Sequence, residues 1–204
     1  MHYFDFYQQF KKFKIFSLND IRKSNPNFHR TRLNEWQNKN YLIKIINKYY
    51  IFSDLNIDEA ILFFIANKIH KSSYISCEMA LAYYSVIPEF VFQITSVNAK
   101  NTCAFNTPIA TFKYRKIKSK LMFGYQLIKN QNIFFKIADL EKTILDYLYF
   151  EKNLQTALDF AGLRFNKILL AEKLNLQKLN NYLKIYQNKK LIKRVTALKK
   201  YIYD

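Results

Sequence analysis

Apolar side chains recur every three or four residues at the start of the chain, which is the spacing of one face of an α-helix. The residues at this spacing are Tyr3, Phe6, Phe10 and Phe13. A second, very short helix is predicted after Ser17, because a serine N-cap and an acidic Asp20 three residues later both stabilise a first helical turn. The polar stretch around Pro26 ends this helix, because proline is tolerated only in a turn or a first helical turn.

A third helix is predicted from about Asn27 to Gln37, and its two faces differ. One arc carries Phe28, Leu33 and Trp36, which would pack on the first two helices. The opposite arc carries Asn27, Arg30, Thr31, Asn34 and Asn38. Arginine can bond guanine O6 and N7, asparagine can bond adenine N6 and N7, and threonine offers a hydroxyl and a methyl. This arc is typical of a helix that reads DNA, and also of an ordinary solvated helix face.

The next stretch, residues 41–52, is β-branched and aromatic on both sides of an Asn47-Lys48 turn, which predicts a hairpin. Three helices followed by a hairpin is the order of a winged helix-turn-helix. In such a module the third helix enters the major groove, and we expect the hairpin tip, which carries Lys44 and Lys48, to lie against phosphate or the minor groove. At the helix flank, Arg32 is expected to reach a phosphate and His29 to be packed. The predicted DNA-binding residues are Asn27, Arg30, Thr31, Arg32, Asn34, Asn38, Lys39, Lys44 and Lys48.

Residues 54–204 predict a second, mixed domain that begins after a polar boundary at 54–58. A helix is expected over 59–69. A second is expected to begin after Ser76, whose hydroxyl would cap it, and to end at Pro88. Alternating patterns over 90–97, 110–114, 125–128 and 133–137 predict a mostly antiparallel sheet of four or five strands, between about 90 and 137. The last two flank residues 129–132, whose composition predicts a hairpin turn. Helices then follow over 140–150, 154–160, 166–174, 176–186 and 190–203. The fold class is therefore α+β, with an N-terminal winged helix-turn-helix over 1–53 and a helical C-terminal part over 139–204.

Composition narrows the class of protein. Half of the 204 residues are hydrophobic, and there are only 2 Gly and 3 Pro, which excludes disorder and collagen-like chains. The longest apolar run, residues 60–66, is too short to span a membrane, and the N-terminus does not resemble a signal peptide. Cys77 and Cys103 lack metal-ligand spacing, which indicates a reducing compartment and no zinc site. We therefore expect a soluble, cytoplasmic protein that binds no membrane.

The net charge of +18 is concentrated at the two ends of the chain. Residues 1–53 hold ten Lys and Arg against three acids, residues 54–163 twelve against ten, and residues 164–204 eleven against two. This segregation suggests that both ends face polyanions, although two solvated faces would show the same pattern. In the tail, a possible second basic surface is formed by Lys184, Lys189, Lys190 and Lys193.

No convergent catalytic set is visible. The stretch Asp139-Leu140-Glu141-Lys142 resembles a nuclease carboxylate element, but an N-cap followed by an acid in the first turn is the expected opening of a helix. The three histidines have no metal-ligand spacing, and two glycines cannot form a phosphate-binding loop. We expect no enzyme activity, no metal and no cofactor. A nuclease fused to a DNA-binding domain would instead need Asp139 and Glu141 for metal-dependent cleavage.

Several blocks of the sequence, in their order and spacing, resemble the AbiEi-type antitoxins of type IV toxin–antitoxin systems. These blocks are residues 15–21, 36–42 and 49–53, then Ser73-Tyr74-Ile75-Ser76, Ala80-Leu81-Ala82-Tyr83-Tyr84 and Ile87-Pro88, and finally residues 94–97, 112–114 and 138–146. The resemblance covers nearly the whole chain except the tail after Leu163. Ser85 and Asn40 stand where the family usually has Gly, and Leu140 stands where it has Pro; all three are positions where backbone conformation matters.

The resemblance implies a function in phage defence. The N-terminal domain would bind inverted repeats in double-stranded operator DNA, as a monomer or weak dimer, and repress its own operon. The C-terminal domain would neutralise a nucleotidyltransferase-like AbiEii toxin. The alternative is a stand-alone winged-helix transcriptional regulator whose C-terminal domain senses a ligand or dimerises. A nucleotidyltransferase in the next open reading frame would favour the antitoxin.

Overall fold

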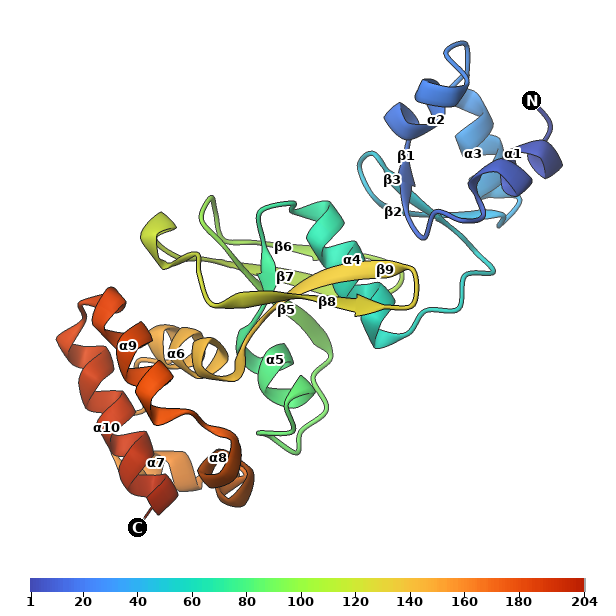
Figure 1. Cartoon of the computed structure of the whole chain (residues 1–204). Coiled ribbons are helices and arrows are strands. Elements are labelled where there is room, and N and C mark those ends of the chain that lie inside the picture. The colour runs from blue at the N-terminus through green and yellow to red at the C-terminus, as the bar shows by residue number, and fades with distance from the viewer. Residues whose placement is uncertain (204) are drawn as a thin grey trace.

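Ten α-helices and two β-sheets make up residues 1–203, the part of the chain that the computed structural model describes. The predicted α+β class is confirmed. Figure 1 shows an elongated molecule in three parts: an N-terminal unit at one end, a larger sheet in the middle and a group of C-terminal helices at the other end. The two chain ends therefore lie far apart.

The N-terminal unit contains three helices and a small three-stranded sheet. Its elements are α1 (Tyr3–Phe10), β1 (Phe16–Ser17), α2 (Leu18–Ser24), α3 (Thr31–Asn38), β2 (Leu42–Ile46) and β3 (Tyr49–Phe52). The predicted cap of α2 is confirmed as a capping box, in which Asp20 N–H donates to Ser17 Oγ and Ser17 N–H donates to Asp20 Oδ2. The predicted hairpin is also confirmed. The sequence reading missed β1, a two-residue strand that pairs with β3 in the order β1-β3-β2.

Helix α3 begins at Thr31, four residues later than predicted. The turn that contains Pro26 continues instead, since the N–H of Phe28 donates to the carbonyl of Asn25. Asn27 therefore lies outside the helix, and Arg30 occupies the N-cap position. The apolar arc packs as predicted, because Phe28, Leu33 and Trp36 are all buried.

The two faces of the small sheet pack on two different hydrophobic clusters. Leu42, Tyr50 and Phe52 join an aromatic core with the three helices, where the Phe6 ring lies 4.6 Å from that of Trp36. Ile45 and Ile51 belong instead to the cluster formed by α4 (Glu59–Ile69) and the larger sheet, together with Ile15 and the partly buried Ile43. Hydrophobic packing thus crosses the boundary expected at residues 53 and 54.

The larger sheet has six strands in the order β6-β7-β5-β4-β9-β8. They are β4 (Tyr74–Ile75), β5 (Gln93–Asn98), β6 (Cys103–Asn106), β7 (Thr111–Lys116), β8 (Tyr125–Asn130) and β9 (Ile133–Ala138). The sheet is mostly antiparallel as expected, since three of its five strand pairs are antiparallel, whereas β5–β7 and β4–β9 are parallel. The expected number of four or five strands is wrong, because the sheet has six. Neither β4 nor β6 was predicted. Strand β4 has only two residues, and it pairs with Val97 and Ile137, which are both distant in sequence.

Two further expectations about this region are wrong. Phe90 and Phe92 precede β5 and are each 81% exposed, so the strand does not begin at residue 90. Helix α5 (Cys77–Tyr83) ends well before Pro88. Ser85, two residues after the end of the helix, has a positive φ of 58°, which is not a helical conformation. The predicted span of α4 is confirmed, with Asp58 as its N-cap.

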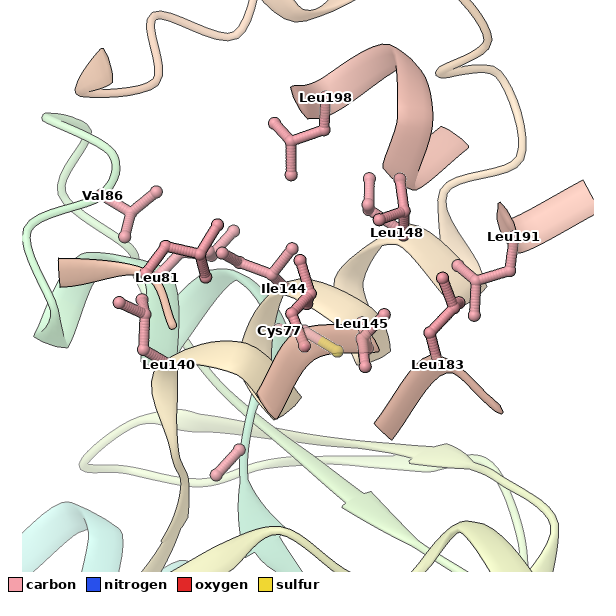
Figure 2. Close-up of a cluster of buried hydrophobic side chains, with 14 of the residues drawn as sticks. Cys77, Leu81, Val86, Leu140, Ile144, Leu145, Leu148, Leu183, Leu191 and Leu198 are labelled. Carbon is pink, nitrogen blue, oxygen red and sulfur yellow. The ribbon is translucent and has the colours of Figure 1, made fainter. Parts of the chain in front are cut away.

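The C-terminal helices surround the largest hydrophobic cluster. They are α6 (Leu140–Phe150), α7 (Ala157–Ala161), α8 (Lys167–Lys173), α9 (Leu176–Tyr186) and α10 (Lys189–Tyr203), and a short 3₁₀ turn at Ser119–Leu121 precedes β8. The predicted bounds of α6 and α9 are confirmed. In Figure 2, Ile144, Leu145 and Leu148 of α6 lie between Leu81 of α5 and leucines of α9 and α10. The tail is therefore docked on the body rather than forming a core of its own.

Candidate nucleic-acid interface

The outer face of α3 presents four neighbouring polar side chains to solvent. Arg30, Thr31, Asn34 and Asn38 are all exposed, and at about 100° per residue they follow one another along a single arc. Leu33 and Trp36 anchor the opposite arc in the aromatic core. Packing of the inner face therefore fixes which side of α3 is available to a ligand.

Arg30 lies beside the tip of the hairpin. A cleft of about 580 Å³ is lined by the start of α2, Arg30 and the hairpin residues Asn47 to Tyr50. Lys48 lies in the turn with a positive φ of 91°, and its side chain is exposed. The structure thus brings the Arg30 and Lys48 cations, predicted separately from the helix and the hairpin, to the walls of one cleft.

The other predicted residues are not gathered around that cleft. Asn27 and Arg32 border a separate hollow of about 400 Å³, and the Arg32 guanidinium pairs with the Glu35 carboxylate at 3.0 Å. Lys44 is half-buried in the middle of β2, opposite Tyr50, so the expectation that it lies at the hairpin tip is wrong. Lys39 is exposed at the C-terminal end of α3.

Two further side chains on α3 or beside it change the predicted picture. Gln37, which the sequence reading missed, donates from Nε2 to Asn34 Oδ1 at 3.4 Å and to the Leu33 carbonyl at 2.9 Å. Its spacing of three residues from Asn34 on a helix is the signal that could have revealed it. His29 is exposed, so the expectation of a packed histidine is wrong. It lies in the turn before α3 rather than on the helix flank.

The tail lysines lie at the other end of the molecule. Lys184, Lys189, Lys190 and Lys193 are all exposed on α9 and α10, and Figure 1 places these helices at the opposite end from α3. They therefore cannot extend the α3 surface on the same copy of the chain. Arg194, which the sequence reading did not single out, is buried and donates to the Leu148 carbonyl.

Asp139 and Glu141 have structural partners. Asp139 caps α6 by accepting from Lys142 N–H, and Glu141 accepts from Asn175 N–H at the start of α9. The Lys178 ammonium lies 2.9 Å from Glu141 and 3.2 Å from Asp139. Although burial opposes the shift, these two carboxylates raise the pKa of Lys178. Both acids therefore join α6 to the start of α9.

A buried ion pair lies one turn further along α6. Lys142 Nζ is 2.5 Å from Asp146 Oδ1, and both side chains are fully buried. Tyr186 Oη of α9 donates to Asp146 Oδ1, while Tyr74 Oη and Ser76 Oγ donate to Asp146 Oδ2. Burial and the Asp146 carboxylate raise the pKa of both tyrosines well above the usual value.

This cluster corrects one prediction and exposes one omission. Ser76 stands at the N-cap of α5, but its hydroxyl bonds to Asp146 rather than capping the helix. The spacing of four residues between Lys142 and Asp146 was visible in the sequence, whereas their burial was not.

The described residues show no grouping of three or more His, Cys, Asp or Glu side chains that could hold a metal ion. Within residues 1–203, no helix combines the length and the apolar character needed to span a membrane. No protein-family model matches the chain, and no curated protein is significantly similar to it.

Proposed function

We propose that residues 1–53 form a winged helix-turn-helix that binds double-stranded operator DNA. The order α1, β1, α2, α3, β2, β3 supports this assignment, with α3 as the helix that enters the major groove and the hairpin as the wing. The observation that carries the proposal is the cleft shared by Arg30 and Lys48, because Arg30 also belongs to the exposed polar arc of α3. Arg30, Thr31, Asn34 and Asn38 supply donors and acceptors for base edges, and Lys48 supplies a charge for phosphate.

An electrophoretic shift series tests this proposal on the inverted repeats upstream of the chain's own coding sequence. Arg30→Ala and Asn34→Ala should each cost about 1–3 kcal/mol of specific binding and relax the sequence preference. The matched control is Arg164→Ala, which removes an exposed arginine at a distance from α3. Equal operator affinity for Arg30→Ala and Arg164→Ala would refute the assignment of α3.

We further propose that the protein acts as the antitoxin of a type IV toxin–antitoxin system. It would repress its operon and neutralise a nucleotidyltransferase-like AbiEii toxin. The resemblance described above supports this role. So does the backbone at Asn40 and Ser85, where the family usually has Gly: both have positive φ values, 56° and 58°, that glycine adopts at the least cost. An inverted repeat has two half-sites, so it would bind two copies of the protein, which would form a weak dimer on the DNA.

Co-expression with the product of the neighbouring gene tests the antitoxin role. When the toxin is expressed from an unrelated promoter, both the intact chain and its Arg30→Ala variant should restore growth. The variant should nevertheless fail to repress the natural promoter. Protection that is seen only when the toxin is expressed from its natural promoter would show that it comes from repression alone. Absence of any rescue by the intact chain would refute the antitoxin role.

A second candidate is a stand-alone regulator whose C-terminal domain senses a ligand. A groove of about 1110 Å³ favours it, lined by α4, α5 and the segment before β5, including Leu62, Met79, Phe90 and Phe92. This volume lies just above the range of about 300–1,000 Å³ that is usual for small-molecule sites. Native mass spectrometry of the protein from its host should then detect a small molecule that Ala82→Trp, which places a large ring in the wall of the groove, retains less well. An unoccupied groove together with toxin rescue would favour the antitoxin.

A further inference from the structure

A second hollow lies between α4 and the β8–β9 hairpin, away from the polar arc of α3. It has a volume of about 350 Å³, and its walls include Phe64, Asn67, Lys68, Lys71, Phe134 and Lys136. Of the described residues that line it, none is acidic. Three cations are therefore gathered in the central segment of the chain, although that segment has nearly balanced charge.

One polar group at this hollow is buried without a partner. Asn67 is 92% buried, with a relative exposure of 8%, and its Oδ1 accepts from the N–H of Lys136 at 2.5 Å. Because a backbone N–H can only donate, this bond fixes the orientation of the amide and leaves Nδ2 on the other side. Among residues 1–203, Asn67 Nδ2 has no hydrogen-bond acceptor. This donor is itself buried from solvent, so Asn67 acts on the hollow through its bond to the Lys136 backbone.

The apolar walls offer flat surfaces beside these donors. Phe134 is 49% exposed and Leu127 is 63% exposed, while Lys68 Nζ lies 5.1 Å from the Phe64 ring centroid. Lys136 Nζ donates to the Lys71 carbonyl at 2.6 Å, and burial lowers the pKa of Lys136. An anion at this position would therefore stabilise an ammonium that has already lost part of its hydration.

We propose that this hollow binds one nucleotide unit, with the phosphate on the lysines and the base against Phe134. A nucleotide combines the two features that the walls complement, negative charge and a planar ring. The volume lies near the lower end of small-molecule sites and leaves room for a single unit. The unit can be a free nucleotide or part of a single strand. The proposal does not depend on operator binding by residues 1–53.

The test measures binding of a fluorescent oligothymidylate, which cannot form an operator duplex, to the full chain. The variant Phe134→Ala/Lys71→Gln removes one exposed ring and one exposed cation from the hollow. The control Phe4→Ala/Lys118→Gln makes the same change outside it, and every later comparison uses this control. We expect the first variant to bind about tenfold more weakly than the control, as for loss of a stacked base and a phosphate contact. Equal affinities of the two variants would overturn the proposal.

Two further measurements separate the sources of the ligand from general attraction to a chain of net charge +18. Polyphosphate, which has no bases, should bind the two double variants equally. Equilibrium dialysis with uridine monophosphate should show binding that Phe134→Ala/Lys71→Gln loses if the natural ligand is a free nucleotide. Discrimination seen only with the oligonucleotide assigns the site to single strands. Arg30→Ala should leave oligothymidylate binding unchanged, so failure of operator binding and failure of this site can be told apart.

Discussion

The N-terminal unit and the C-terminal tail are both strongly basic, but their charges are placed on different kinds of surface. On α3, Arg30 stands beside Thr31, Asn34 and Asn38, whose side chains offer fixed donors and acceptors. On the exposed side of α9 and α10, the cations are lysines, which act as point charges with no acceptor. Similar charge densities therefore differ in what they can recognise: base edges in the first case, only negative potential in the second.

The two ends also differ in how they are attached. The N-terminal unit has an aromatic core of its own and meets the rest through one face of its small sheet. The tail shares its core with α5 and α6, and Tyr186 joins the buried Lys142–Asp146 pair. The tail is thus part of the body's stability, whereas the N-terminal unit can lose its ligand surface without loss of the body's packing.

The largest expected effect tests the attachment of the tail. Lys142→Met should lower the free energy of unfolding by about 3–5 kcal/mol, because it leaves the Asp146 carboxylate buried without its cation. The double variant Lys142→Met/Asp146→Asn should recover a large part of this loss, because it removes both charges and keeps an amide oxygen that can accept from the surrounding hydroxyls. Urea unfolding followed by circular dichroism measures both. If the single and double variants prove equally stable, the buried pair does not join the tail to the body as described.

Removing the Tyr186 hydroxyl should have a smaller effect, about 1–3 kcal/mol at neutral pH, because Lys142 and Asp146 each lose a partner. Since the folded-state pKa of Tyr186 is raised, its contribution is fully present below the unfolded value of about 10 and is lost as the pH rises above it. Alkaline unfolding of Tyr186→Phe should therefore be shallower than that of the unsubstituted protein. Identical pH profiles above pH 10 would contradict this account.

At the other end, Lys48→Ala should weaken binding to all DNA sequences alike. If Lys48 contacts one phosphate, the slope of log affinity against log salt should fall by about 0.9. Operator and unrelated duplexes measured at several salt concentrations give both quantities. A variant that changes sequence preference instead would mean that the hairpin tip reads bases.

The smallest expected effect concerns the tail lysines. Glutamine at all four positions, Lys184, Lys189, Lys190 and Lys193, should leave the salt slope of operator binding unchanged, because α9 and α10 lie at the far end from α3. The matched comparison is Lys48→Ala, measured in the same buffers. A slope reduced by about 0.9 per lysine would contradict the separation of the two surfaces. An unchanged slope with reduced toxin rescue would indicate that the lysines contact an acidic toxin or its RNA substrate. If neither quantity changes, the four lysines form an ordinary solvated surface.

Local chemistry in the sequence was enough to place most helices and both hairpins. Ser17 with Asp20, Asp58 and Asp139 each begin a helix where their side chains satisfy its first N–H groups. The hairpins around Asn47 and Gln131 were readable for the same reason, since their turns and strands are contiguous. The start of α3 was predicted four residues too early, because the turn that contains Pro26 continues through Phe28 before the helix begins at Thr31.

The tertiary structure alone decided the features that depend on distant partners. Strand β4 has two residues and exists because Val97 and Ile137 flank it, and these pairings set the mixed order of the sheet. The shared cleft of Arg30 and Lys48 requires the hairpin to fold back onto the start of α2. The unpartnered Asn67 donor likewise appears only when α4 packs on β9. Helix caps and turns are determined within a few residues, whereas strand pairing, burial and clefts arise only when the whole chain packs.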